Sequence, residues 1–214
     1  MRKNICALVC VVAVLLFFSN IGMAQERENR YGIGARLSRI DATDDTVDDV
    51  TFDPDGTILY EGNLTYYFSN SFSLEFLIGY TKTDVAAEIL GLGIDFGELK
   101  QIPLLLTGHY HHWINPKSNI YLGGGIGYYL QDFSLSSLVK SVNPNLDIEA
   151  DDSFGYHVNA GVETFITDNT TVNLDLKYIW NAADFTSTEP GFPDDTDKID
   201  LNAFVIGLGI KYYF

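Results

Sequence analysis

The stretch FSLEFLIGYTK, residues 72–82, alternates between large apolar and mostly polar or small side chains with a period of two. A helix would scatter the apolar side chains around its circumference, whereas a strand places every second side chain on the same face. We therefore predict a strand with one strongly apolar face. That face holds Phe72, Leu74, Phe76, Ile78 and Tyr80, and the other holds Ser73, Glu75, Leu77, Gly79 and Thr81.

Seven further segments repeat this alternation along the chain. At a rise of about 3.3 Å per residue and a tilt near 40°, ten or more residues span a band of about 25 Å. This length suits the apolar thickness of an outer membrane. The seven segments are residues 31–40, 58–68, 102–112, 120–131, 153–165, 171–180 and 198–214.

The connections between these segments alternate between short and long. Short turns are expected at 69–71, 115–119 and 167–169, and long polar segments at 41–57, 83–99, 132–152 and 181–197. Short periplasmic turns and long external loops produce this pattern. A soluble β-sandwich is the alternative, but its outer strand faces should be polar. We predict an all-β fold: an eight-stranded antiparallel up-and-down transmembrane β-barrel with both termini in the periplasm.

The first residues have the features of an export signal. Arg2 and Lys3 precede an apolar run that ends near small residues around Ala24, so we expect a signal peptide over 1–24 and a barrel domain over 25–214. Cys6 and Cys10 both lie in the leader, which would leave the mature chain without disulfides or thiolate ligands. The mature chain would then have 29 acidic and 11 basic residues, and this negative charge argues against nucleic acid as a partner.

Aromatic residues mark the expected membrane interfaces. The chain ends in KYYF, which places an outward aromatic, Phe214, at the C-terminus. Terminal aromatics of this kind are typical of the signal that the barrel assembly machinery reads. The other outward aromatics expected near strand ends are Tyr66, Tyr110, Tyr178, Trp180 and Tyr212.

Five segments, in order, resemble the OmpW family of eight-stranded outer-membrane barrels. The resemblance implies a narrow barrel with a largely hydrophobic interior that binds or passes small hydrophobic compounds, with sideways release through the wall. This chain has only Pro103 where the family often has a proline pair, and Trp180 points outward, so the family's constriction role is not assigned to it. The segments are LTYYFSNSFSLEFLIG (64–79), IPLLLTGHYHHW (102–113), IYLGGGIGYYL (120–130), DSFGYHVNAGVETFITDNTTVNLDLKYIW (152–180) and VIGLGIKYYF (205–214).

Eight strands enclose an interior that side chains nearly fill, which excludes a wide aqueous pore. Strand direction predicts an apolar upper interior above a polar floor. The upper residues either line a ligand pocket or merely fill the barrel. The upper apolar set is Leu59, Leu105, Ile179 and Val205. The predicted inward charges, balanced enough to form a paired network, are Arg36, Glu61, Glu75, Glu163, Asp175, Lys177 and Lys211.

The stretch TGHYHHW, residues 107–113, holds three of the four histidines. On a strand, His109 and His111 point inward and low, whereas His112 points to lipid near the periplasm. Zinc would need further ligands from other strands, so hydrogen bonding in the polar floor is the favoured role. A lipid A-modifying enzyme would need an outward histidine near the outer leaflet, and His112 is at the wrong end. We expect no metal, no cofactor and no catalytic site.

The four long segments carry 21 of the 29 acidic residues. A calcium loop is an alternative for DATDDTVDDVTFDPDG, but its spacing does not fit an EF-hand, and a solvated repulsive face is favoured. We expect the protein to contact outer-membrane lipid and lipopolysaccharide and to bind or pass small hydrophobic molecules. The alternative is a structural or surface-interaction barrel without transport.

Overall fold

The computed structural model describes residues 29–42, 45–47, 50–54, 56–89, 92–191 and 193–214. The predicted signal peptide over 1–24 lies outside these residues. Among the described residues, no helix has the length and hydropathy needed to cross a membrane.

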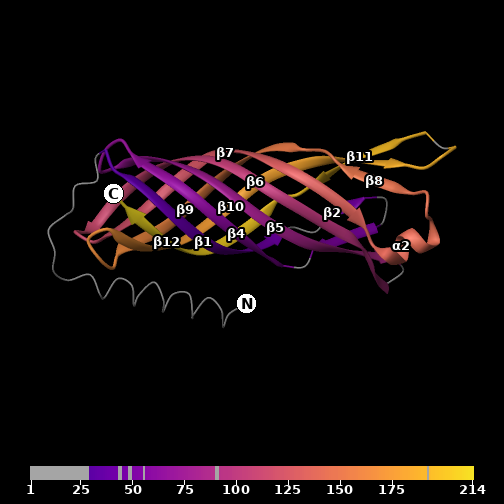
Figure 1. Cartoon of the computed structure of the whole chain (residues 1–214), viewed down its shortest axis with the longest axis horizontal. Coiled ribbons are helices and arrows are strands. Elements are labelled where there is room, and N and C mark those ends of the chain that lie inside the picture. Colours follow the sequence, from indigo (N-terminus) through magenta and orange to yellow (C-terminus); the bar gives the residue numbers. More distant parts are fainter. Residues whose placement is uncertain (1–28, 43–44, 48–49, 55, 90–91, 192) are drawn as a thin grey trace.

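Eight antiparallel strands close into a ring, as the alternation predicts. Each pairs with the next along the chain, and β12 pairs with β1 to complete the circle. Figure 1 shows the strands tilted against the long axis of the barrel. The eight are β1 (Tyr31–Ala42), β4 (Thr57–Tyr67), β5 (Phe72–Ile89), β6 (Leu92–Asn115), β7 (Ser118–Leu135), β9 (Ser153–Phe165), β10 (Thr170–Thr188) and β12 (Ala203–Tyr213).

Smaller elements extend the wall at the end opposite the C-terminus (Figure 1). They are β2 (Asp45–Val47), β3 (Val50–Pro54), α2 (Ser137–Val142), β8 (Asp147–Ala150) and β11 (Asp195–Asp200). The three short turns lie at the C-terminal end, and this end is the periplasmic one. The extended end carries the long connections and is extracellular.

The prediction that the long segments are plain loops is wrong in part. Within 83–99, β5 and β6 stay paired beyond the apolar belt, through Thr83–Leu99 up to Ile89–Leu92. Strand β10 likewise runs to Thr188 and pairs with both β8 and β11. The predicted strand over 198–214 is in fact divided between β11 and β12. Beyond the membrane these strands stay paired, because the cross-strand hydrogen bonds satisfy their backbone N–H and C=O groups.

The side chains divide between the two faces of the wall as the alternation predicts. On β4, Leu59, Glu61 and Asn63 are buried, whereas Tyr60 and Leu64 are exposed on the outer face. Rings gather at both edges of the outer belt: Tyr31 lies beside Tyr66 and Phe214, and Trp180 stacks on Tyr156. The outward placement of Trp180 agrees with the prediction, and this exterior is the lipid-facing surface.

A row of glycines on β7 leaves room inside the barrel. Gly123, Gly125 and Gly127 point inward, and a Cβ on any of them would collide with side chains from neighbouring strands. At Gly125 it would also lie 2.0 Å from the carbonyl oxygen of Leu106. The absent side chains of β7 therefore leave room for larger side chains of the neighbouring strands β6 and β9.

Candidate functional site

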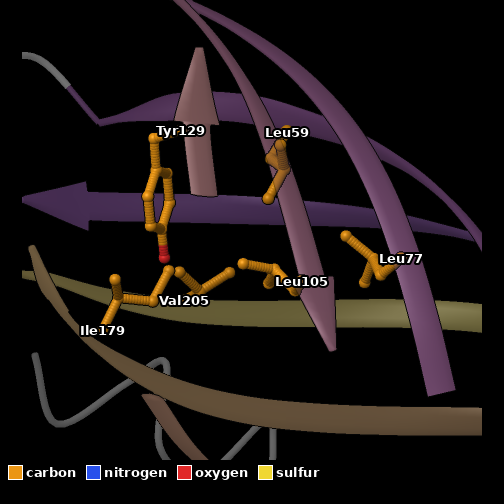
Figure 2. Packing of buried hydrophobic residues seen from close by; sticks show 6 residues of the cluster. All are labelled: Leu59, Leu77, Leu105, Tyr129, Ile179 and Val205. Carbon is orange, nitrogen blue, oxygen red and sulfur yellow. The ribbon is translucent and has the colours of Figure 1, made fainter. Parts of the chain in front are cut away.

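Six buried side chains form one apolar cluster inside the barrel, which we call the apolar layer. All four residues of the predicted upper set belong to it, joined by Leu77 and Tyr129, which that set had not included. Figure 2 shows their side chains converging from different strands. The apolar layer comprises Leu59, Leu77, Leu105, Tyr129, Ile179 and Val205, each no more than 7% exposed.

Strand pairing brings these side chains to one level. Leu77 on β5 and Leu105 on β6 are direct cross-strand partners. Gly127 makes space beside them, since a Cβ there would lie 2.6 Å from Cδ2 of Leu105. Ile40 packs against the cluster from β1. The layer is thus an apolar section of the lumen.

A group of buried charges lies directly beneath, and we call it the charged layer. On three strands a charged residue sits two positions nearer the short turn than a member of the apolar layer: Glu61 after Leu59, Glu75 before Leu77, and Lys177 before Ile179. The charged layer comprises Arg36, Glu61, Glu75, Asp175, Lys177 and Lys211, all at most 5% exposed.

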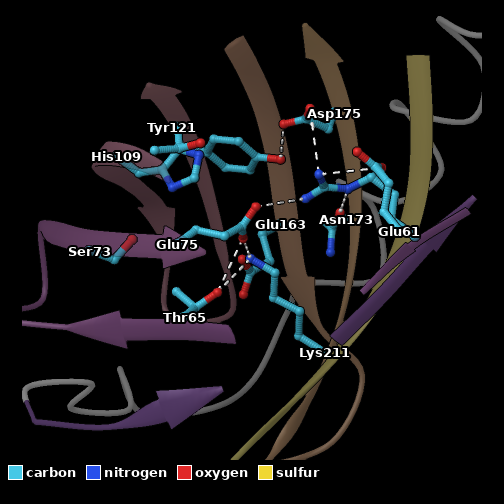
Figure 3. Close-up of polar contacts among 12 residues, drawn as sticks. Glu61, Thr65, Ser73, Glu75, His109, Tyr121, Glu163, Asn173, Asp175 and Lys211 are labelled. Atoms are coloured by element: carbon cyan, nitrogen blue, oxygen red, sulfur yellow. Dashed lines mark hydrogen bonds and ion pairs between the residues drawn. The ribbon is translucent and has the colours of Figure 1, made fainter. Parts of the chain in front are cut away.

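Arg36 is the centre of the charged layer. Its guanidinium nitrogens lie 3.7 Å from Glu61 Oε2, 3.5 Å from Glu75 Oε1 and 3.8 Å from Asp175 Oδ1. Its Nε also donates to Asn173 Oδ1 at 3.3 Å. Figure 3 shows that the side chains of Glu61, Glu75, Asp175 and Asn173 gather in one region of the lumen. One cation thus offsets three buried anions at once.

The two lysines complete the pairing from β10 and β12. Lys177 Nζ lies 3.2 Å from Glu61 Oε1, and Ser38 donates to the other oxygen of that carboxylate at 2.6 Å. Lys211 pairs with Glu75 and donates to Thr65 Oγ1 at 3.2 Å. Six of the seven predicted inward charges are therefore paired with one another. Buried ions are tolerated only when they are paired and hydrogen-bonded, and these contacts meet that requirement.

The inward histidines are hydrogen-bonded within this polar region. His111 contacts Ser73 Oγ at 2.9 Å and Asn119 Oδ1 at 2.9 Å, and His109 contacts Asn159 Nδ2 at 3.1 Å. His157 contacts Thr107 Oγ1 at 2.8 Å. Hydrogen bonding is also the role that the sequence TGHYHHW favours for His109 and His111. In the described part of the chain, no three His, Cys, Asp or Glu side chains are grouped as metal ligands.

Aromatic rings close the periplasmic end below the charges. The alternation alone does not predict that these rings form a layer. We call Tyr67, Phe165 and Tyr213 the aromatic base, with Trp113 packed against it. The hydroxyl of Tyr213 donates to Glu163 Oε1 at 2.8 Å. This bond places Glu163, one of the predicted inward charges, at the boundary with the base. The end of the barrel is therefore filled by rings.

A hydrogen-bonded arc of polar side chains lies above part of the apolar layer. Gln101 Nε2 donates to Gln131 Oε1 at 3.3 Å, Gln131 Nε2 to Ser153 Oγ at 2.7 Å, and Ser153 Oγ to Asn181 Oδ1 at 2.9 Å. Its members come from β6, β7, β9 and β10. A polar arc therefore borders the apolar layer on this side, and it could be recognised only once the neighbouring strands were known.

Two consecutive residue pairs between β5 and β6 are missing from the ladder at the level of the apolar layer, although the register on either side of them is the same. The pairing of β5 with β6 passes from Ile78–Leu104 directly to Thr81–Gln101, which leaves out Gly79, Tyr80, Ile102 and Pro103. Proline has no backbone N–H to donate to a ladder. On the other edge of β6, pairing with β7 continues through Pro103–Tyr129. We call this stretch of the ladder the β5–β6 seam.

Ion pairs hold the same strands together beyond the lipid-facing belt. Lys82 on β5 lies 2.5 Å from Glu98 Oε2 on β6, and Lys100 contacts Glu98 and Asp132. The hydrogen bond from Lys82 and its positive charge lower the pKa of the Glu98 carboxyl. These pairs are solvent-exposed, so each contributes little to stability.

A family model for the OmpW family matches residues 36–214. The chain belongs to the OmpW family. Outer membrane protein W of Vibrio cholerae is 24% identical to this OmpW-family chain, over 96% of this chain and 98% of the relative. The uncharacterized outer-membrane protein y4mB of Sinorhizobium fredii is 24% identical over 74% of this chain. That match covers 66% of the relative, so the chain spans slightly less than two thirds of its length.

Solved structures show the same fold. OprG from Pseudomonas aeruginosa superimposes with a TM-score of 0.78 at 18% identity, over 90% of this OmpW-family chain and 99% of OprG. AlkL in lipid bilayers gives 0.62 at 23% identity, over 91% and 94%. These likenesses establish the eight-stranded barrel and, with the family, the location in the outer membrane.

Proposed function

We propose that this outer-membrane barrel binds small hydrophobic molecules in its apolar layer and releases them sideways into the membrane. The observation that carries the proposal is the order of layers along the lumen. Apolar side chains lie on the extracellular side, and a dense set of paired charges and rings lies beneath them. An apolar molecule gains free energy on leaving water for the apolar layer and would lose it on entering the charges.

The β5–β6 seam supports sideways release. It lies beside Leu77 and Leu105, two members of the apolar layer, and faces lipid on its other side. A ligand leaving here would break fewer cross-strand pairs than elsewhere along the same two strands. The resemblance to the OmpW family implies the same route, and the seam is the part of this wall that fits it.

Contacts outside the lumen belong to the same proposal. The exposed belt of aromatic and aliphatic side chains faces outer-membrane lipid, and the acidic extracellular segments face the lipopolysaccharide headgroups. Phe214 is 62% exposed on the outer face, and its backbone pairs with Tyr31. Phe214 is therefore accessible for the proposed recognition by the barrel assembly machinery.

The binding step is tested by replacing Leu105 with threonine. We expect the affinity for n-nonane to fall about tenfold, because an uncompensated hydroxyl in an apolar site costs roughly 1–3 kcal/mol. Binding would be measured by calorimetry on the protein in lipid nanodiscs. Electrophoretic mobility with and without heating would confirm that each variant is folded.

Leu106→Thr is the matched control, since the adjacent residue is 43% exposed on the outer face of the same strand. This variant should bind n-nonane as the wild type does. Equal affinity for Leu105→Thr and Leu106→Thr would contradict the proposal. Failure of the wild type to bind n-nonane would contradict it as well.

A further inference from the structure

One polar atom lies inside the apolar layer. Tyr129 is 4% exposed, and Figure 2 shows its hydroxyl directed toward Val205 and Ile179. Among the described residues this oxygen has no hydrogen-bond partner. Buried tyrosine hydroxyls normally find a partner, because leaving such a donor unpaired is costly. Phenylalanine would fill the same space without that cost.

The backbone around Tyr129 leaves room for the ring in this position. A Cβ at Gly127 would lie 2.9 Å from Cε2 of Tyr129 and 3.0 Å from its hydroxyl oxygen. A Cβ at Gly155, on the neighbouring strand, would lie 3.0 Å from the same ring carbon. Two glycines therefore flank the tyrosine ring, and side chains there would push it out of the cluster.

Polar groups close to Tyr129 are already engaged with each other. Ser153 is its cross-strand partner on β9, yet the Ser153 hydroxyl receives from Gln131 and donates to Asn181. This polar arc satisfies its own members and leaves the Tyr129 hydroxyl facing apolar carbon. The hydroxyl is thus an available donor inside a site that otherwise offers only apolar contacts.

We propose that the Tyr129 hydroxyl donates a hydrogen bond to an oxygen atom of the bound molecule. The apolar layer then selects small apolar compounds that carry a single carbonyl or ether oxygen, such as ketones and esters, over hydrocarbons of equal length. This selectivity rests on the proposed function. A single donor fixes the orientation of the ligand, while the five aliphatic side chains contact its apolar chain.

The test compares 2-nonanone with n-nonane on the wild type and on Tyr129→Phe in lipid nanodiscs. We expect the wild type to favour the ketone, and the ratio of the two affinities to fall about 3- to 10-fold in the variant, as loss of one hydrogen bond predicts. The alkane should bind the variant at least as tightly as the wild type, because phenylalanine removes an unpaired hydroxyl from the apolar site. In the infrared spectrum, the ketone C=O stretch should shift to lower frequency on the wild type only.

Tyr128→Phe is the matched control, because the neighbouring hydroxyl donates to Asp152 at 2.9 Å on the exposed side. It should leave the affinity ratio and the C=O stretch unchanged. An unchanged ratio in Tyr129→Phe, with n-nonane still bound, overturns the selectivity and leaves the proposed function standing. Failure of both probes to bind the wild type overturns the proposed function and the selectivity together.

Discussion

Replacing Arg36 with methionine should lower the free energy of unfolding by about 3–5 kcal/mol, because it leaves buried carboxylates without their shared cation. Glu61, Glu75 and Asp175 each lie within 4 Å of its guanidinium, and all are at most 5% exposed. The two lysines reach Glu61 and Glu75, whereas Asp175 would lose its ion pair with Arg36 and retain hydrogen bonds from Tyr121 and Asn159. Urea unfolding in lipid vesicles measures the change.

Arg39→Met supplies the control on the same strand. Arg39 pairs with Asp41 at 2.8 Å, but the two side chains are 60% and 51% exposed. Exposed pairs of this kind contribute about 0–1 kcal/mol. Were both arginine variants to unfold at the same urea concentration, the interior acids would not depend on Arg36, and the charged layer would not be the paired network that we describe.

Replacing Tyr213 with alanine should have a similarly large effect at the periplasmic end. The side chain is fully buried, its ring centroid lies 5.8 Å from that of Tyr67 and 6.0 Å from that of Phe165, and its hydroxyl binds Glu163. Loss of a large aromatic side chain from a packed site costs about 3–5 kcal/mol. Because the aromatic base closes this end, ion conductance across planar bilayers should also rise.

Tyr212→Ala tests whether position inside the barrel is what matters. This neighbouring tyrosine is 51% exposed on the outer face, so its loss should change stability less and conductance not at all. If the two alanine variants conduct alike, the rings of the aromatic base do not obstruct the lumen.

Alternation alone predicted which way most side chains point, because a period of two assigns each residue to one face. That was enough to place Arg36 and Glu75 inside the lumen and Tyr212 and Trp180 outside it. It also grouped Leu59, Leu105, Ile179 and Val205 as an upper apolar set, since strand direction gives an approximate height. These placements agree with the structure, and the ligand-binding role of the four residues stays a prediction.

Features that depend on lateral neighbours were not predicted. Leu77 faces inward by alternation, but only the β5–β6 register shows that it meets Leu105. The arc from Gln101 to Asn181 crosses four strands, and its bonds depend on how those strands stagger around the ring. The extension of β5 and β6 into water was missed because polar composition indicated loops, although backbone pairing continues wherever the hairpin stays extended.

Photolabelling with a nine-carbon alkyl diazirine, mapped by mass spectrometry on the protein in lipid, tests the central claim most directly. The account predicts adducts on Leu77, Leu105 and Tyr129, and on Pro103 at the β5–β6 seam, which excess n-nonane suppresses. Adducts on lipid-facing Ile126 should persist under the same competition. Labelling confined to outward residues such as Ile126 would show that apolar molecules dissolve around the barrel without entering it, and would contradict the account.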